Sequence, residues 1–324
     1  MSYPVIPMKK IDMGRERILL PCGIGDVYWS LVKLQAFCAE KGIKDPYVAI
    51  ITAKSEPKYE GSEYRSLEFL KMVPFVKIDT PPNVEARPKP TPPWLNDIYM
   101  EMWHGAKTVY PGFMGYDYFL VYNSAITNGR FLEMVDNLEC NWYFPMYVSE
   151  KQDQFKIDSE ETYGDYAIYL WSFCGGGYSH YHIKEFHPDK ITESIKQFTK
   201  LTGLRPVFVG SWWDVNHGNN YLKDMIAAVP GSVDLVGKTT IDQLFGVIKG
   251  SKMVVGAHCG PTILSTVFHK KTIMMWAKSY PSFAPASPLA VAPPDTRWTN
   301  YFPVFTNGLT VDTFVGTMME LYAN

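Results

Sequence analysis

The sequence has few cysteines, little net charge and no long apolar run. Its five cysteines are an odd number without C-x-x-C spacing, which argues against a disulfide framework or a zinc site and fits a reducing compartment. A formal net charge of −2 gives no global attraction to nucleic acid or to an anionic bilayer. No apolar stretch approaches the ~18–20 residues that span a membrane, and the N-terminus carries no signal-peptide core. These absences predict a soluble, cytoplasmic protein.

The composition predicts a globular chain of two domains. Of the 324 residues 46% are hydrophobic and 20% charged, and single cores stop growing near ~250–300 residues. Short apolar strands alternate with helices in both halves, which is typical of an α/β fold with parallel sheets. The segment 149–163 is polar and lacks an apolar period, so it is the best candidate for an interdomain linker. The predicted domains are therefore 1–155 and 156–305, followed by a last helical segment, 306–324.

The stretch 231–277 gives the clearest indications of function. Its strands and helices alternate, and ligands of a parallel sheet bind where strands end at their carboxyl side. The predicted elements are a strand at 233–236, a helix from Thr239 or Thr240, a strand at 253–256, a second helix and a strand at 272–276.

The turn at 256–262 follows such a carboxyl end. Its glycines let a ligand approach the backbone, and the N–H groups at the start of the next helix favour an anion such as a phosphate. The residues predicted to hold that anion are His258, Cys259, Gly260, Pro261 and Thr262.

Two nucleotide-binding motifs are incomplete. Gly237-Lys238-Thr239 looks like the end of a P-loop, but the nearest upstream glycine leaves five intervening residues instead of four, and those five form a predicted strand. Near the N-terminus, a dinucleotide fingerprint would follow Gly23 and Gly25 with a third glycine where the chain has Tyr28. The triphosphatase interpretation fails, and the dehydrogenase interpretation is weak.

Asp26 lies at the start of a predicted helix at 27–41, directly after a predicted strand at 17–21. A carboxylate in this place is either a helix cap or a catalytic base, and the residues leave both interpretations open.

Other polar and aromatic residues follow predicted strands of the second half. Lys184 is a solvated lysine or a phosphate ligand, and Trp212 stacks on a base or ribose or merely closes the end of the domain. His180 and His182 lack an evident third ligand, so no metal site is predicted.

Four segments, in this order, resemble motifs of the heptosyltransferase-like glycosyltransferases (glycosyltransferase family 9). Gly23-Ile24-Gly25-Asp26-Val27 looks like the G-x-G-D-V/I turn of that family, and Lys184 to Pro188 resembles its K-x-W-P segment. Leu235 to Leu244 is similar to L-x-G-K-T-S-L-x-E-L, and Val254 to Leu264 is similar to V-V-G-N-D-T/S-G-P-M-H-L.

The resemblance implies a GT-B fold, in which two Rossmann-like domains face each other across a cleft and a C-terminal helix crosses back to the N-terminal domain. It implies an inverting, metal-independent enzyme without a cofactor that transfers a sugar from a nucleotide-diphosphate sugar to a hydroxyl group. Asp26 would be the base, with Gly23, Gly25 and Tyr28 lining the acceptor side. The donor would be held by Lys184, Trp212, Gly237, Lys238, Thr239, His258, Cys259, Gly260, Pro261 and Thr262.

The sequence departs from that family at two places. His258 stands where the family motif has an acidic residue, and Ile263 where it has histidine, so the donor or the activity differs. The acceptor stays open between a glycan, a small molecule and a hydroxymethylated DNA base. A non-catalytic nucleotide-sugar binder and a sugar-nucleotide epimerase are the alternatives.

Overall fold

The chain divides into two compact units, Met1–Tyr147 and Val148–Asn324, which are described separately below. The boundary therefore lies before the predicted one at residue 155. The structure, a computed structural model, describes residues 15–20, 23–50, 62–79, 109–111, 117–120, 139–147, 149–171, 184–211, 214, 221–277 and 292–324.

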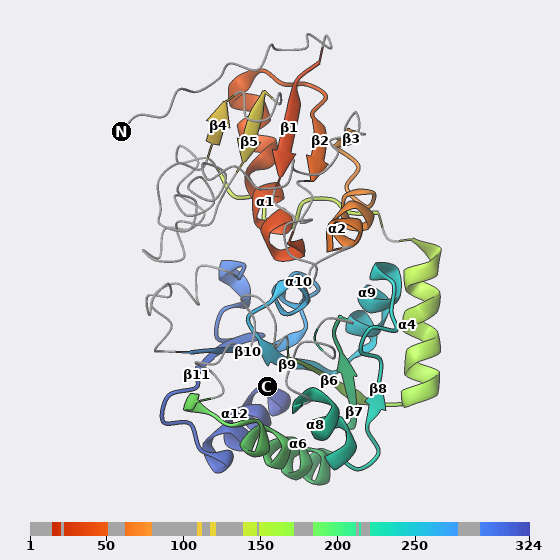
Figure 1. Cartoon of the computed structure of the whole chain (residues 1–324), viewed down its shortest axis with the longest axis vertical. Helices are drawn as coiled ribbons and strands as arrows, with labels where there is room; N and C mark the ends of the chain where they lie inside the picture. Colours follow the sequence, from red (N-terminus) through yellow and green to blue (C-terminus); the bar gives the residue numbers. More distant parts are fainter. Residues whose placement is uncertain are drawn as a thin grey trace, which may run out of the picture. The chain divides into compact units, whose positions relative to one another are not determined.

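The first unit is built on a five-stranded sheet with the order β3-β2-β1-β5-β4 (Figure 1). The strand β1 pairs in parallel with β2 and β5, whereas β4 is antiparallel to β5. The strands β2 and β3 thus lie on one side of β1, and β5 and β4 lie on its other side. The elements are β1 (Arg17–Leu20), α1 (Ile24–Lys41), β2 (Tyr47–Ile50), α2 (Ser62–Leu70), β3 (Lys77–Ile78), β4 (Val109–Pro111) and β5 (Tyr118–Leu120).

Helix α1 packs its predicted apolar face into the core of the first unit. Val27, Leu31 and Leu34 are fully buried, and Cys38 is nearly so. The helix ends at Gly42, whose φ of 72° is the left-handed conformation that glycine adopts without strain. It begins at Ile24, earlier than predicted, so Gly25 and Asp26 lie inside its first turn.

The second unit contains a six-stranded, fully parallel sheet with the order β11-β10-β9-β6-β7-β8. Its predicted strands and helices are confirmed to within a few residues. The elements are α4 (Glu150–Tyr163), β6 (Tyr166–Leu170), α6 (Pro188–Thr202), β7 (Arg205–Val209), α8 (Tyr221–Ala228), β8 (Val233–Asp234), α9 (Ile241–Gly250), β9 (Met253–Ala257), α10 (Gly260–Val267), β10 (Lys271–Trp276), η4 (Pro294–Thr296), β11 (Tyr301–Phe305) and α12 (Val311–Ala323).

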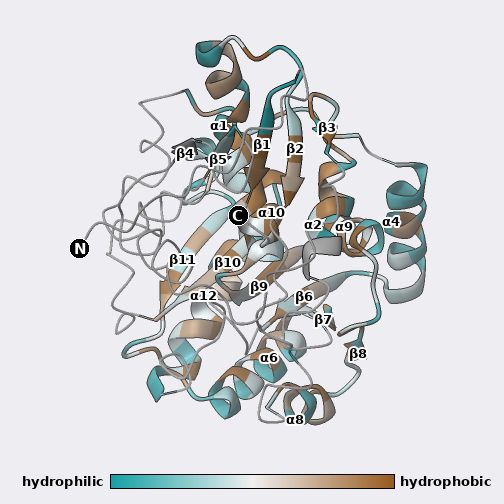
Figure 2. Cartoon of the chain, turned by 45° about the horizontal axis from the view of Figure 1, so that its top comes forward, coloured by the Kyte–Doolittle hydropathy of each residue, from teal (hydrophilic) through white to brown (hydrophobic). Residues whose placement is uncertain are grey.

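The predicted interdomain linker is in fact helix α4, which packs on α9. Figure 2 shows α4 as a mostly hydrophilic helix, which explains why the sequence gave no amphipathic signal. Two glycines of α9 permit the contact: a Cβ on Gly246 would lie 2.7 Å from the carbonyl oxygen of Gln152, and one on Gly250 would lie 3.3 Å from that of Lys156. Helix α4 therefore packs on α9 through close backbone contact and polar side chains, without an apolar stripe of its own.

Those polar contacts centre on Asp242 of α9. Its carboxylate accepts hydrogen bonds from Ser149 Oγ at 3.1 Å and from Gln152 Nε2 at 3.0 Å, and Lys249 Nζ donates to Gln152 Oε1 at 3.0 Å. Gln152 is buried, so these bonds satisfy polar groups that would otherwise oppose packing.

Replacing Gly246 with alanine is expected to lower the free energy of unfolding by about 1–3 kcal/mol, because the added methyl group meets backbone that cannot move aside cheaply. Gly316 in α12 is the matched control: it is also helical, and nothing lies within 4 Å of its ideal Cβ, so alanine there should be neutral or stabilise by up to about 1 kcal/mol. Urea unfolding of the two variants measures the difference, and equal effects would contradict the close α4–α9 contact.

The last helix, α12, packs in the second unit. Phe314, Val315, Met318 and Leu321 join the core that also contains residues of α6 and the strands. The predicted apolar face and its cap, Thr310, are confirmed, and the face packs against α6. The reason is geometric: Phe186, which precedes α6, sets its ring edge-on against Phe314 at 5.5 Å and so completes that core.

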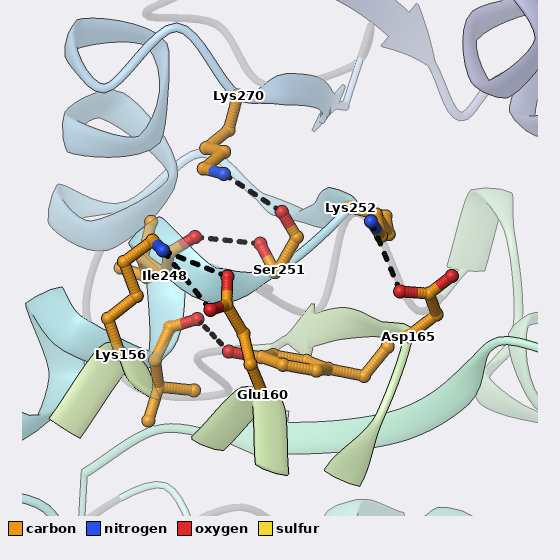
Figure 3. Close-up of polar contacts among 9 residues, drawn as sticks. Lys156, Glu160, Asp165, Ile248, Ser251, Lys252 and Lys270 are labelled. Carbon is orange, nitrogen blue, oxygen red and sulfur yellow. Dashed lines mark hydrogen bonds and ion pairs between the residues drawn. The ribbon is translucent and has the colours of Figure 1, made fainter. Parts of the chain in front are cut away.

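Two lysines lie at the amino edge of the same sheet, and their side chains donate hydrogen bonds to backbone carbonyl groups. Figure 3 shows Lys270, whose Nζ donates to the carbonyl of Ser251 at 3.0 Å and so covers the end of α9. Lys271 Nζ donates to the carbonyl of Tyr322 at 2.7 Å. Burial lowers the pKa of Lys270, and Lys156 and Lys252 nearby lower it further, while Glu160 opposes them. Lys270 and Lys271 therefore support packing at the edge opposite the carboxyl ends of the strands.

Candidate functional site

The carboxyl edge of the second sheet gathers most of the predicted donor residues. Because all six strands are parallel, every strand ends at this edge (Figure 1). The chain adds β7 and β8 on one side of β6 and then places β9 on the other side, so the strand order reverses between β6 and β9. Ligands of open α/β sheets bind at such a reversal. The turn at 258–262 follows β9 directly at this point.

Gly256 brings helix α10 close to the sheet. A Cβ at this position would lie 2.2 Å from the carbonyl oxygen of Leu170 and 3.0 Å from Thr262 Cγ2. Only glycine fits between strand β6 and the first turn of α10, so this residue is required for packing. The start of α10 is thereby held against the end of β9.

Most hydrogen-bonding groups of the turn are used within it. Thr262 Oγ1 accepts from the Cys259 N–H at 3.0 Å and lies 2.8 Å from the carbonyl oxygens of Ala257 and Cys259, while the Ile263 N–H donates to Cys259 O. Pro261 has no N–H. Among the described residues no hydrogen-bond acceptor is found for the N–H of Gly260, the first residue of α10. The turn therefore has fewer free N–H groups for an anion than the sequence predicted, because Thr262 caps its own helix.

Cys259 is a half-buried residue whose thiol is enclosed. Burial raises the pKa of this thiol to about 12, the nearby Asp214 carboxylate also raises it, and hydrogen bonds from Thr262 lower it in part. The thiol is therefore neutral at physiological pH and is no nucleophile.

Two buried thiols predict alkaline destabilisation. Burial raises the pKa of Cys38 to about 11 and that of Cys259 to about 12 from 9.0, so the unfolded chain loses these protons first as the pH rises through about 9. The unfolded state then binds fewer protons than the native state, and the free energy of unfolding falls with pH, by about 2 kcal/mol per thiol at about pH 10.5. Urea unfolding at about pH 8 and about pH 10.5 measures this loss. The Cys38→Ala variant should show a smaller loss, and an equal one would contradict the assignment.

The imidazole of His258 stacks on the indole of Trp276. The ring centroids lie 4.6 Å apart and the planes are 9° from parallel. Strand register explains the contact: Ala257 pairs with Met275, so the next residues of β9 and β10 lie side by side, and the His258 N–H donates to Met275 O at 3.3 Å. Trp276 is buried, whereas His258 is partly exposed at the end of β9.

Gly237, Lys238 and Thr239 lie between strand β8 and helix α9, apart from the turn at 258–262. The order β9-β6-β7-β8 separates them from His258 by three strand spacings, about 14 Å. Lys238 Nζ pairs with Asp234 at 2.7 Å, and Gly237 has a φ of 72°, a conformation that favours glycine. The predicted role of these three residues in binding the donor stays a prediction, and their segment is stabilised by its own local contacts.

Lys184 is exposed and lies next to a residue anchored at the carboxyl edge. The neighbouring carboxylate of Glu185 accepts a hydrogen bond from Thr306 Oγ1 at 2.5 Å, and the Thr306 N–H donates to Trp276 O at 2.9 Å. These contacts place the backbone of Lys184 near the ends of β10 and β11. Trp212, His180 and His182 lie outside the described residues.

The predicted acceptor side follows β1, which lies at the strand reversal of the first sheet. Gly23 is the N-cap of α1 with extended backbone, φ −78° and ψ 140°, and Asp26 is the third helical residue. The side chain of Asp26 lies outside the described part of the structure. Tyr28 is fully buried and donates from its hydroxyl to Trp142 O at 3.0 Å, so its side chain belongs to the core of the first unit.

Three residues that matter to this edge were missed by sequence reasoning. Trp276 and Thr306 act through contacts between strands, and only the strand register could have signalled them. Asp214 is buried and accepts from the Ser211 N–H at 2.8 Å, a local turn contact that its spacing after Ser211 could have suggested.

Comparison with known proteins shows the fold. No protein-family model matches the chain, and no curated protein matches its sequence. Among solved structures, E. coli ADP-heptose LPS heptosyltransferase II matches with a TM-score of 0.57 at 15% identity, covering 95% of this chain and 98% of the other. A family 9 glycosyl transferase from Veillonella parvula matches with a TM-score of 0.60 at 10% identity, covering 95% and 97%.

The chain has the GT-B fold of the heptosyltransferases. E. coli heptosyltransferase WaaC with ADP also matches, with a TM-score of 0.50 at 12% identity and coverage of 94% and 99%. The GT-B chain thus spans nearly the full length of these proteins, and both of its sheets belong to the likeness. In the described parts of the chain, no helix combines the length and apolarity needed to cross a membrane.

Proposed function

We propose that this protein is an inverting, metal-independent glycosyltransferase that moves a sugar from a nucleotide-diphosphate sugar to an acceptor hydroxyl. One observation carries the proposal: two of the four segments that resemble family 9 motifs lie at the carboxyl ends of β1 and β9, the strands at which the two sheets reverse their order. Ligand sites of open α/β sheets lie at these positions. The likeness in fold to an ADP-heptose enzyme supports the same reaction class.

The donor diphosphate is assigned to the carboxyl edge of the second sheet. The start of α10 supplies the Gly260 N–H and the positive end of the helix dipole, and Lys184 supplies an exposed cation. A leaving diphosphate gains negative charge as the glycosidic bond breaks, so these groups favour bond cleavage without a metal ion. The His258 imidazole adds a third group beside the helix start.

The acceptor hydroxyl is assigned to the segment after β1. Sugar transfer requires a base that takes the proton of the attacking hydroxyl, and Asp26 is the acid residue of the Gly23–Asp26 segment. Attack on the anomeric carbon from the face opposite the diphosphate inverts its configuration. The acceptor is a glycan, a small molecule or a hydroxymethylated base of DNA.

A two-step experiment tests the proposal. Isothermal calorimetry with ADP, UDP, GDP and dTDP identifies the nucleotide, and the matching nucleotide sugars are then incubated with the enzyme while released nucleoside diphosphate is measured with and without acceptors. We expect one nucleotide to bind and acceptor-dependent release to follow. Tight binding without turnover would identify a non-catalytic binder, release of altered sugar without acceptor would identify an epimerase, and no nucleotide binding would refute the proposal.

A further inference from the structure

Thr306 joins the segment that carries Lys184 to the carboxyl edge of the second sheet. It directly follows β11 and is fully buried, and its Oγ1 donates to the Glu185 carboxylate at 2.5 Å. The Thr306 N–H donates to the carbonyl oxygen of Trp276, the last residue of β10, at 2.9 Å. The Glu185 carboxylate is therefore held at the ends of two neighbouring strands, one residue away from Lys184.

The residues after Glu185 fix the same segment in the core. Phe186 is fully buried, and its ring packs edge-on against Phe314 of α12 with the centroids 5.5 Å apart. His187 is then the N-cap of α6, so a regular helix follows at once. Because Glu185 is anchored at the sheet edge and Phe186 in the core, the backbone of Lys184 has a fixed place.

The side chain of Lys184 lies within reach of the proposed phosphate site. The residue is exposed, and in the parts of the chain that the structure describes its ammonium has no hydrogen bond or ion pair. The order β11-β10-β9 places Thr306 two strand spacings, about 10 Å, from the turn that leads into α10. A flexible lysine side chain spans part of this distance, and a diphosphate bound at the start of α10 spans the rest.

We propose that Thr306 and Glu185 are positioning residues, whose hydrogen bond holds the Lys184 ammonium at the terminal phosphate of the nucleoside diphosphate. This inference rests on the proposed function and specifies how its donor site keeps a cation in place without a metal ion.

The hydrogen bond favours phosphate binding in two ways. An unanchored lysine loses backbone and side-chain freedom when it pairs with a phosphate, whereas an anchored one loses side-chain freedom alone. The bond also orients Glu185, because the oxygen that accepts from the buried Thr306 hydroxyl lies at the strand ends. A carboxylate that could turn toward Lys184 would attract its ammonium and compete with the phosphate. Removing the Thr306 hydroxyl should therefore weaken diphosphate binding through Lys184.

The test is a double-mutant cycle on the full chain, read by calorimetry with the nucleoside diphosphate that binds wild type and with the matching monophosphate. Lys184→Ala should weaken diphosphate binding about tenfold, as expected for one charge-assisted contact. Thr306→Val should weaken it about threefold, because the cost of ordering one side chain returns. Monophosphate affinity should not change in either variant, and Thr306→Val should cause no further loss in the Lys184→Ala background.

Two matched variants separate positioning from a general loss of stability. Thr306→Ser keeps the hydroxyl group and should retain the wild-type affinity for the diphosphate. Thr272→Val makes the same change at a fully buried threonine near the amino end of β10, where Oγ1 donates to the carbonyl of Lys270 at 2.8 Å. This variant should lower the free energy of unfolding and leave diphosphate binding unchanged.

The outcomes distinguish this inference from the proposed function. Equal diphosphate affinity of wild type and Thr306→Val, or of wild type and Lys184→Ala, would overturn the inference, and so would an undiminished effect of Thr306→Val in the double variant. Failure of wild type to bind any nucleoside diphosphate would refute the proposed function itself.

A second pair of variants tests the same hydrogen bond if Thr306→Val does not fold. Glu185→Gln keeps an oxygen that accepts from Thr306 and should retain the diphosphate affinity. Glu185→Leu removes the acceptor and should weaken binding about threefold, with no further loss in the Lys184→Ala background. Equal affinities of the two Glu185 variants would overturn the inference.

Discussion

Replacing Asp26 with asparagine is expected to lower the rate of sugar transfer about 10²–10⁴-fold, because the variant cannot accept the proton of the attacking hydroxyl. Nucleotide affinity should not change, since the proposed donor site lies in the other unit. The measurement is kcat with the donor and acceptor identified by turnover, together with the calorimetric affinity of the nucleoside diphosphate.

A structural role of Asp26 predicts a different result. A carboxylate in the first turn of α1 that serves only the helix dipole would contribute about 0.3–1 kcal/mol to stability and nothing to kcat. Asp45→Asn, at an exposed position of the same unit, controls for a general loss of negative charge. Wild-type turnover by Asp26→Asn would refute the assignment of the base.

Replacing Asp79 with alanine should destabilise the first unit by about 3–5 kcal/mol, because it removes the buried carboxylate that pairs with the buried guanidinium of Arg17. The Asp79 carboxylate is fully buried and accepts from Arg17 Nε at 2.7 Å, and Arg15 approaches it at 3.1 Å. Arg17 is 5% exposed, so water cannot replace the lost partner.

Hydrogen exchange at the amides of β1 and β2 measures this effect in the first unit alone. Asp45→Ala is the matched control: it removes the exposed ion pair with Lys77, whose atoms lie 3.2 Å apart, and should cost no more than about 1 kcal/mol. Similar exchange rates in the two variants would show that the buried pair contributes little.

Local sequence signals predicted the elements of the second unit well. Apolar runs such as Tyr166–Leu170 are buried strands, and the capping box of Thr240 and Gln243 starts α9 where the sequence placed it. These features depend on side-chain chemistry within one or two turns, which the sequence displays directly.

Contacts between distant segments were not predictable in the same way. The polar segment 150–163 forms α4 because Gly246 and Gly250 let another helix approach its backbone, and glycines far along the chain carry no sign of that partner. The apolar face of α12 was clear, but its partners, the ring of Phe186 and the rest of that core, come from distant segments.

The sequence by itself determined that the chain alternates strands and helices, and that its glycine-containing turns follow strands, because these properties are written in neighbouring residues. Tertiary structure decided which turns share a site. Strand order sets β8 apart from β9, register brings Trp276 under His258, and the hydrogen bonds of Thr262 use up groups that a ligand was expected to contact. Pairing across a sheet joins residues that are distant in sequence, and no local pattern records such a pairing.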